Sequence, residues 1–158
     1  MGLSVLMKMP SIRVEVTIAA PVEAVWAAVE DISSHVRWME DAVAIRFTSP
    51  TRSGVGAAFD CDTKVGPFRL TDRMVVTEWD PPRIMGIRHA GVVTGSGRFV
   101  LTATATGAST TFAWEEDLVF PVWMGAAVGG AAAAPLLRRV WRRNLRNLKT
   151  LVEGARGV

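Results

Sequence analysis

PLLRRVWRRNLRNLKTLVE, the stretch from Pro135 to Glu153, divides into an apolar and a basic half when it is drawn as a helix. At about 100° per residue, the apolar half contains Leu136, Leu137, Val140, Trp141, Leu145, Leu148, Leu151 and Val152. The basic half contains Arg138, Arg139, Arg142, Arg143, Arg146 and Lys149. This pattern predicts a long amphipathic helix, which needs a large apolar surface to lie on.

The preceding hundred residues predict such a surface. Residues 12–18 alternate between apolar and polar types, as a half-buried strand does. Pro21 suits the first position of a short helix, and Ser33 is expected to cap a second one that reaches Trp38. The apolar stripe of the first helix consists of Val22, Val25, Trp26 and Val29, and we expect Trp26 in the core. Turn signals then separate about six strands between Ala42 and Phe120.

These elements predict a single α+β domain over residues 11–154, with residues 1–10 as a loose leader. A long helix laid across a curved antiparallel sheet of about seven strands tends to enclose a cavity. A Gly- and Ala-rich connection, residues 124–134, leads into that helix. We therefore expect a container for a small molecule.

The composition is that of a soluble domain, with 158 residues of which 49% are apolar and 21% charged. The single cysteine, Cys61, excludes an intrachain disulfide and favours a reducing compartment. No segment resembles a signal peptide, and the apolar run 122–134 is too short to cross a membrane. We expect a cytoplasmic protein.

The net charge of +3 is concentrated in one segment. Residues 135–150 carry six basic and no acidic side chains, so the rest of the chain has a net charge of −3. A solvated helix face explains such a pattern, with arginine stems covering apolar surface. Weak peripheral contact with an anionic membrane is the alternative. No aromatic residues alternate with these arginines in the way that single-strand binding needs, and we expect no nucleic-acid partner.

Several segments resemble the START-like, or SRPBCC, superfamily. They are residues 18–26 (IAAPVEAVW) with Asp31 and Trp38, residues 78–83 (EWDPPR) and residues 145–153 (LRNLKTLVE). The resemblance covers about residues 11–154 and is greatest to the polyketide cyclase/dehydrase and lipid-transport branch. It implies a helix-grip fold, with a curved antiparallel sheet wrapped around the C-terminal helix. It also implies an apolar ligand held between sheet and helix, whereas only a minority of such proteins are cyclases.

Strand alternation assigns side chains to the inner face of the sheet. The predicted ligand-binding residues are Trp38, Phe59, Cys61, Met74, Met85, Ile87, Phe99, Leu101, Trp114, Glu116, Leu137, Trp141, Asn144 and Leu145. Ala103 continues the inner row of Phe99 and Leu101. A turn at residues 107–108 would place Glu116 opposite Phe99 and Trp114 opposite Leu101. A turn at residues 81–82 would place His89 opposite Met74 and diagonal to Asp72.

A few polar groups interrupt this apolar surface. Asp72, His89 and Glu116 are candidates for acid/base chemistry, because burial can raise the pKa of a carboxyl group. The alternatives are that the two carboxylates are solvated or structurally hydrogen-bonded, and that His89 lies on the surface. We expect Asn144 to contact a ligand or water, since an unpaired amide among apolar side chains is costly. Cys61 can simply pack as a small apolar residue.

Other chemistry lacks its motifs. Two histidines and one cysteine do not form a convincing metal site, and no CxxC, HExxH, GxGxxG, phosphate loop or GxSxG occurs. Residues 95–97 (GSG) are expected to mark a bulge within a strand. We therefore expect no metal and no cofactor.

Three functions remain open. The first is a carrier or sensor of an apolar small molecule such as a lipid, a polyketide-like aromatic or an isoprenoid. The second is a cyclase or dehydratase acting on a similar ligand, with Glu116 or Asp72 as acid, His89 as base and Asn144 orienting a carbonyl. The third is a protein-interaction module that uses the arginine face. The ligand's identity and the oligomeric state do not follow from the sequence.

Overall fold

The computed structural model describes residues 6–121 and 133–157. Its strands are β1 (Leu6–Lys8), β2 (Ile12–Ile18), β3 (Ala42–Phe47), β4 (Ala58–Val65), β5 (Phe68–Asp80), β6 (Ile84–Ala90), β7 (Thr94–Ala103) and β8 (Thr110–Pro121). Its helices are α1 (Val22–Val29), a 3-10 helix (Ile32–Arg37) and α3 (Ala133–Arg156). The six strands expected between Ala42 and Phe120 are all present.

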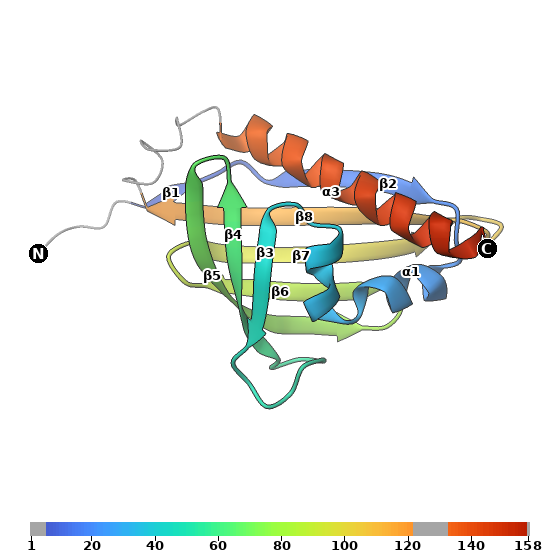
Figure 1. The fold of residues 1–158 in the computed structure, drawn as a ribbon, viewed down its shortest axis with the longest axis horizontal. Coiled ribbons are helices and arrows are strands. Elements are labelled where there is room, and N and C mark those ends of the chain that lie inside the picture. The colour runs from blue at the N-terminus through green and yellow to red at the C-terminus, as the bar shows by residue number, and fades with distance from the viewer. Residues whose placement is uncertain (1–5, 122–132, 158) are drawn as a thin grey trace, which may run out of the picture.

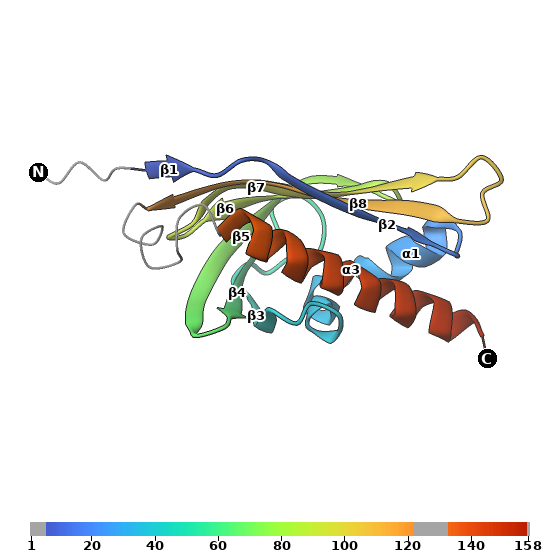
Figure 2. The ribbon, with the colours of Figure 1, turned by 90° about the horizontal axis from the view of Figure 1, so that it is seen from above.

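All eight strands form one antiparallel sheet (Figure 1). The strand order is β1-β8-β7-β6-β5-β4-β3, and β2 also pairs with β8. The sheet curves, and Figure 2 shows α3 lying diagonally across one of its faces. This arrangement confirms the expected α+β helix-grip fold.

The eighth strand lies in the segment that was expected to be a loose leader. β1 pairs with the end of β8, with Leu6 opposite Pro121 and Lys8 opposite Val119. Met9 follows it into the core and is only 6% exposed. The expectation of a leader over residues 1–10 was therefore wrong for residues 6–9, because β8 extends beyond β2 and leaves backbone groups for a further strand to pair with.

The short helices bury the residues that their spacing predicts, but the cap of the second differs. Val25, Trp26 and Val29 of α1 are buried. The 3-10 helix begins after Asp31, whose carboxylate accepts a hydrogen bond from the Ser33 backbone N–H at 3.0 Å. Asp31 therefore caps this helix in place of the predicted Ser33, since a cap side chain bonds an N–H two or three residues ahead.

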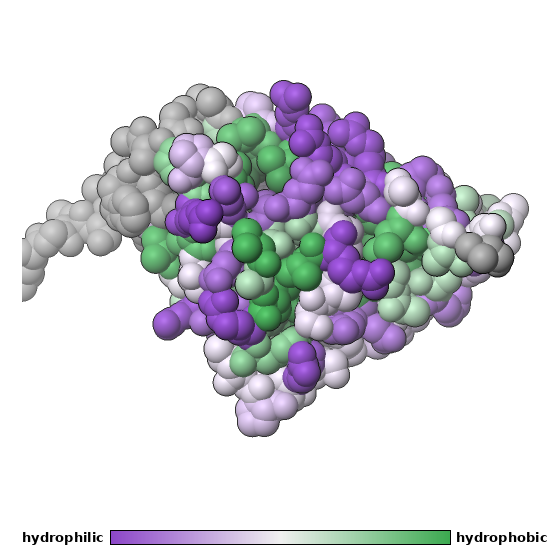
Figure 3. Space-filling model, in the orientation of Figure 1, coloured by the Kyte–Doolittle hydropathy of each residue, from purple (hydrophilic) through white to green (hydrophobic). Residues whose placement is uncertain are grey.

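The C-terminal helix confirms the division into two faces. Trp141, Leu145, Leu148 and Val152 are buried against the sheet. The basic residues form the hydrophilic band that crosses the upper part of Figure 3, above an apolar patch over β3 and β4. No helix of the described residues is long and apolar enough to cross a membrane.

The register between β7 and β8 differs from the prediction by two residues. Phe99 lies opposite Trp114 and Leu101 opposite Phe112, so Glu116 faces Gly97. The turn is centred one residue earlier than expected, within residues 104–109, where the Thr104 N–H bonds the Ser109 carbonyl. A one-residue displacement of the turn moves each partner by two positions. The inner and outer faces are therefore unchanged.

Two smaller expectations about β7 are also corrected. The pairing of β7 with β6 and β8 runs without interruption through residues 95–97, so no bulge occurs there. Ala103 is exposed at the end of β7 and does not line the cavity. The expectation that it continues the inner row up to the cavity is therefore wrong.

Candidate functional site

A cavity of about 220 Å³ lies between the inner face of the sheet and α3. Most of its lining is apolar and comes from β4 to β8, α3 and the 3-10 helix. The predicted ligand-binding residues that line it are Phe59, Cys61, Met74, Met85, Ile87, Phe99, Trp114, Glu116, Leu137 and Trp141. A largely apolar cavity with a few polar groups is typical of a small-molecule site.

Four of the predicted residues do not line the cavity. Trp38 is 1% exposed and packs among other aromatic rings, including Phe99 and Trp114. Leu101 and Leu145 are equally buried in the hydrophobic core. These side chains face inward as predicted, but neighbouring side chains separate them from the cavity.

Asn144 has a structural role in place of the expected contact with ligand or water. The side chain is fully buried, and its oxygen accepts the Glu40 backbone N–H at 3.0 Å. Its amide nitrogen donates to Asp41 Oδ1 at 2.6 Å. Asn144 therefore fastens α3 to the segment that follows the 3-10 helix, and this pairing satisfies an amide that would otherwise be costly to bury.

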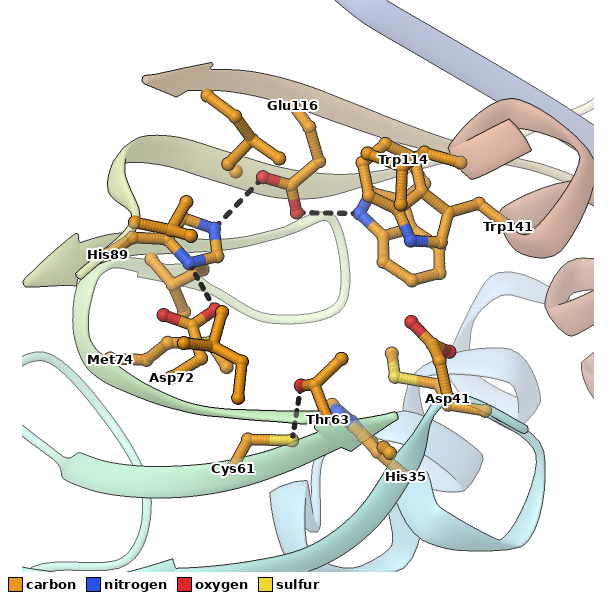
Figure 4. Close-up of a pocket in the computed structure, with 18 of the residues that line it drawn as sticks. His35, Asp41, Cys61, Thr63, Asp72, Met74, His89, Trp114, Glu116 and Trp141 are labelled. Carbon is orange, nitrogen blue, oxygen red and sulfur yellow. Dashed lines mark hydrogen bonds and ion pairs between the residues drawn. The ribbon is translucent and has the colours of Figure 1, made fainter. Parts of the chain in front are cut away.

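The polar centre of the cavity is a chain of hydrogen bonds through His89 (Figure 4). His89 Nδ1 bonds Asp72 Oδ2 at 2.7 Å, and His89 Nε2 bonds Glu116 Oε2 at 3.0 Å. Trp114 Nε1 donates to the other oxygen of Glu116 at 2.8 Å. Each of the three acid/base candidates is less than 10% exposed. Surface and solvated positions for these residues are thereby excluded, whereas an acid/base role for them stays a prediction.

The sheet register brings these residues together. His89 on β6 lies opposite Met74 as predicted, which places it diagonal to Asp72 on β5. Glu116 approaches from β8, across β7, where its partner is Gly97. A Cβ at Gly97 would overlap the Glu116 carboxylate. The absence of a side chain there lets Glu116 reach over β7 toward His89.

The two carboxylates hold His89 in its charged form. Burial alone would lower the pKa of His89, but the hydrogen bonds and charges of Asp72 and Glu116 outweigh burial and raise its pKa to about 10. The imidazolium then donates from both ring nitrogens. Within this chain of bonds only Asp72 Oδ1 is buried with no hydrogen-bond partner among the described residues.

Three further ionisable residues line the cavity that the sequence alone did not assign to it, namely His35, Asp41 and Arg98. His35 Nε2 lies 2.7 Å from the Val29 carbonyl, and burial lowers the pKa of this histidine to about 4. Burial also raises the pKa of Asp41, against the hydrogen bond from Asn144. Spacing offered a signal for His35, since Ile32, His35 and Trp38 recur every three residues and all are buried, as one face of a 3-10 helix should be.

Cys61 has the properties of a packed thiol. It is 5% exposed, and burial raises its pKa to about 11. The Thr63 hydroxyl donates to its sulfur at 3.8 Å. A neutral thiol of this kind is a poor nucleophile. Over residues 6–121 and 133–157, no group of three His, Cys, Asp or Glu side chains has the arrangement of a metal site.

The sequence matches a known family over almost its whole length. The model of the family described as polyketide cyclase / dehydrase and lipid transport matches residues 9–153. A search of curated proteins found no match.

Solved structures share the fold. The Zhui aromatase/cyclase from Streptomyces sp. R1128 superposes with a TM-score of 0.72 at 19% identity, over 93% of this chain and 94% of that one. A START superfamily protein from Mycobacterium smegmatis superposes with a TM-score of 0.74 at 14% identity, over 92% of this chain and 98% of that one. The di-domain ARO/CYC protein StfQ of the steffimycin biosynthetic pathway gives 0.69 at 14%, over 94% of this chain and 52% of that chain. Identities this low show a common fold and leave activity open.

Proposed function

Because the chain belongs to the polyketide cyclase/dehydrase and lipid-transport family, we propose that it binds an apolar small molecule in the cavity between the sheet and α3, as a carrier or sensor. The observation that carries this proposal is the cavity of about 220 Å³ with its largely apolar lining. Aromatic rings and flexible methionines, such as Trp114, Trp141, Met74 and Met85, suit an irregular apolar guest.

The hydrogen bonds of His89 and Glu116 within the protein support a carrier. Both ring nitrogens of His89 and both oxygens of Glu116 already have partners within the protein. A general base needs a free lone pair within reach of the substrate, and a His89 imidazolium has none to offer. The cluster therefore favours holding a ligand over transforming it.

Binding of N-phenyl-1-naphthylamine, a neutral dye that fluoresces in apolar surroundings, tests this proposal. We expect a dissociation constant in the micromolar range, or about −8 kcal/mol. Ile87→Trp fills the cavity from β6 and should abolish binding. Ala103→Trp adds the same ring at an exposed position of β7 and should leave binding unchanged. A dye that binds the Ile87→Trp variant as well as wild type contradicts the proposed location, and a wild-type protein that binds no apolar compound contradicts the function.

The second candidate is a cyclase or dehydratase. One specific observation favours it, namely a buried cluster of two carboxylates and an imidazole that borders an apolar cavity. Substrate could break one of these hydrogen bonds and take over the released acid or base. Mass spectrometry of the ligand extracted after incubation separates the two functions. A carrier returns its ligand unchanged, whereas a dehydratase releases a product lighter by one water.

A further inference from the structure

The ionisable groups that face the cavity do not balance in charge. Three carboxylates line it, those of Asp41, Asp72 and Glu116, together with two cationic side chains, those of His89 and Arg98. His35 is neutral at pH 7, since burial holds its pKa at about 4. Because Arg98 is already paired with Glu78 and Glu115, the two carboxylates of Asp72 and Glu116 have only the His89 imidazolium beside them, which leaves an excess negative charge at the cavity.

The nearby basic side chains do not compensate for this charge. Arg98 borders the cavity, but its guanidinium pairs with Glu115 at 3.2 Å and with Glu78 at 3.6 Å, and its side chain is 45% exposed. The arginines of α3 lie mainly on the outer face of the helix. The segment 122–132 (VWMGAAVGGAA) contains no charged residue. No lysine or arginine of the described residues is therefore placed to receive a ligand carboxylate or phosphate.

The same lining offers hydrogen-bond acceptors. Asp72 is 8% exposed and its Oδ1 has no partner among the described residues, although Asp72 lines the cavity. Asp41 also borders the cavity, beside the stacked rings of Trp114 and Trp141 (Figure 4). A buried carboxylate oxygen without a partner favours a ligand that donates an O–H or N–H group. Aromatic faces beside it tolerate a cation as well.

We infer that the cavity selects apolar molecules whose polar group is a hydrogen-bond donor, an alcohol, phenol or amine, and that it rejects carboxylates of the same shape. This inference rests on the proposed function and specifies the chemical class of its ligand. A carboxylate would enter beside Asp72 and Glu116 with no cation of its own to pair with. Repulsion between like charges in a desolvated site weakens the binding of a carboxylate enough for the cavity to discriminate it from an alcohol of the same shape.

Four naphthalene derivatives of nearly equal shape test the inference by calorimetry or equilibrium dialysis at pH 7. They are 1-naphthylmethanol, 1-naphthylmethylamine, 1-methylnaphthalene and 1-naphthoate. We expect the alcohol and the ammonium to bind at least as tightly as the hydrocarbon, and the carboxylate at least about tenfold more weakly than the alcohol. A carboxylate that binds as tightly as the alcohol overturns the inference.

Variants locate the selectivity. Asp72→Asn removes one negative charge from the cavity. The ratio of the dissociation constants of the carboxylate and the alcohol should therefore fall by about tenfold or more. Asp41→Asn should act in the same direction. Asp60→Asn is the matched control, because Asp60 lies on β4 beside Arg73 on the outer face of the sheet. In this variant the ratio of the two dissociation constants should equal that of wild type. Unchanged selectivity in both Asp72→Asn and Asp41→Asn overturns the inference.

The outcomes also distinguish this inference from the proposed function. If 1-methylnaphthalene and N-phenyl-1-naphthylamine bind but the carboxylate binds equally well, the proposed function is supported and the inferred selectivity against carboxylates is wrong. If none of these compounds binds to folded wild-type protein, both the proposed function and the inferred selectivity are wrong.

Discussion

Gly97 and Glu116 lie directly opposite each other in the β7–β8 ladder, and the missing side chain of Gly97 leaves the space that the Glu116 carboxylate occupies. The backbone of Gly97 is not in the left-handed region, so its conformation does not require a glycine. The close approach of the Glu116 carboxylate does require one. Gly97 is therefore as much a part of the buried cluster as Asp72, His89 and Glu116.

Gly97→Ala should displace Glu116 from His89 and lower the free energy of unfolding by about 2–4 kcal/mol, since a buried carboxylate would lose its partners. Urea denaturation measures the loss. Gly154→Ala on α3, where an added Cβ meets nothing within 4 Å, is the control and should stabilise the protein by up to about 1 kcal/mol. In a Glu116→Ala background the Gly97→Ala change should cost much less, because the clash is gone. An equal cost in both backgrounds contradicts the contact.

The two histidines should titrate far apart. The pKa of His89 is raised to about 10 by its two carboxylates, and the pKa of His35 is lowered to about 4 by burial. NMR titration should therefore find one imidazole charged throughout the neutral range and the other neutral. His35→Gln assigns the signals by removing one of them. Two histidines that both titrate near pH 6.5, the value of a solvated side chain, would contradict the buried cluster.

These shifts make stability depend on pH in opposite directions on the two sides of about pH 6.5. His89 binds its proton more tightly when folded, so its contribution is complete below that pH and disappears as the pH rises through about 10. His35 binds its proton less tightly when folded, so its contribution to the free energy of unfolding is present above about pH 6.5 and is lost as the pH falls toward about 4. Urea midpoints measured from pH 4 to pH 10 should fall on both sides, and His35→Gln should flatten the acidic side.

The elements of the fold were predictable because their patterns report burial directly. The two faces of residues 135–153 and the alternation in each strand arise from contact with the core. The same alternation is insensitive to a shift of two residues, which is why the β7–β8 register was misplaced while the inner row remained correct. β1 was missed because three residues are too few to show a period.

The polar cluster was only partly predictable. Alternation placed Asp72, His89 and Glu116 on the inner face, but their mutual hydrogen bonds depend on the true register and on the space at Gly97. Asn144 was recognised as an amide in an apolar arc, whereas its partners, Glu40 and Asp41, follow a turn whose position no pattern reports.

Asn144→Leu should destabilise the protein because it removes the partners of the Glu40 backbone N–H and of the Asp41 carboxylate. Leaving two such groups unpaired should cost about 2–4 kcal/mol. It should also raise the pKa of Asp41 further, since the hydrogen bond from Asn144 now lowers it. Urea denaturation measures the cost. An unchanged stability would show that water replaces the amide.

The arginine face of α3 should matter little to folding. Arg142 and Arg146 are exposed on the helix, and exposed charges contribute about 0–1 kcal/mol each. Thermal unfolding of the Arg142→Gln/Arg146→Gln variant should therefore give nearly the wild-type midpoint. Salt-sensitive binding of wild type, but not of this variant, to anionic vesicles would support the membrane contact considered for this face. Loss of the fold would contradict the assignment of the faces.

Trp141 should couple the stability of the protein to occupation of the cavity. Its ring stacks on Trp114 with centroids 5.1 Å apart and an interplanar angle of 25°, and it is 5% exposed while lining the cavity. Trp141→Ala should lower the free energy of unfolding by about 3–5 kcal/mol, as truncation of a packed tryptophan does. Leu136→Ala, at an exposed position of the same helix, is the control and should cost far less.

Ligand binding reports on the same ring. A ligand that contacts Trp141 should quench part of the tryptophan fluorescence of wild type, and that part should be missing in Trp141→Ala. A loss of stability well below that of a packed tryptophan would mean that the ring borders empty space. Quenching that persists unchanged in the variant would contradict a contact between the ligand and the Trp141 ring.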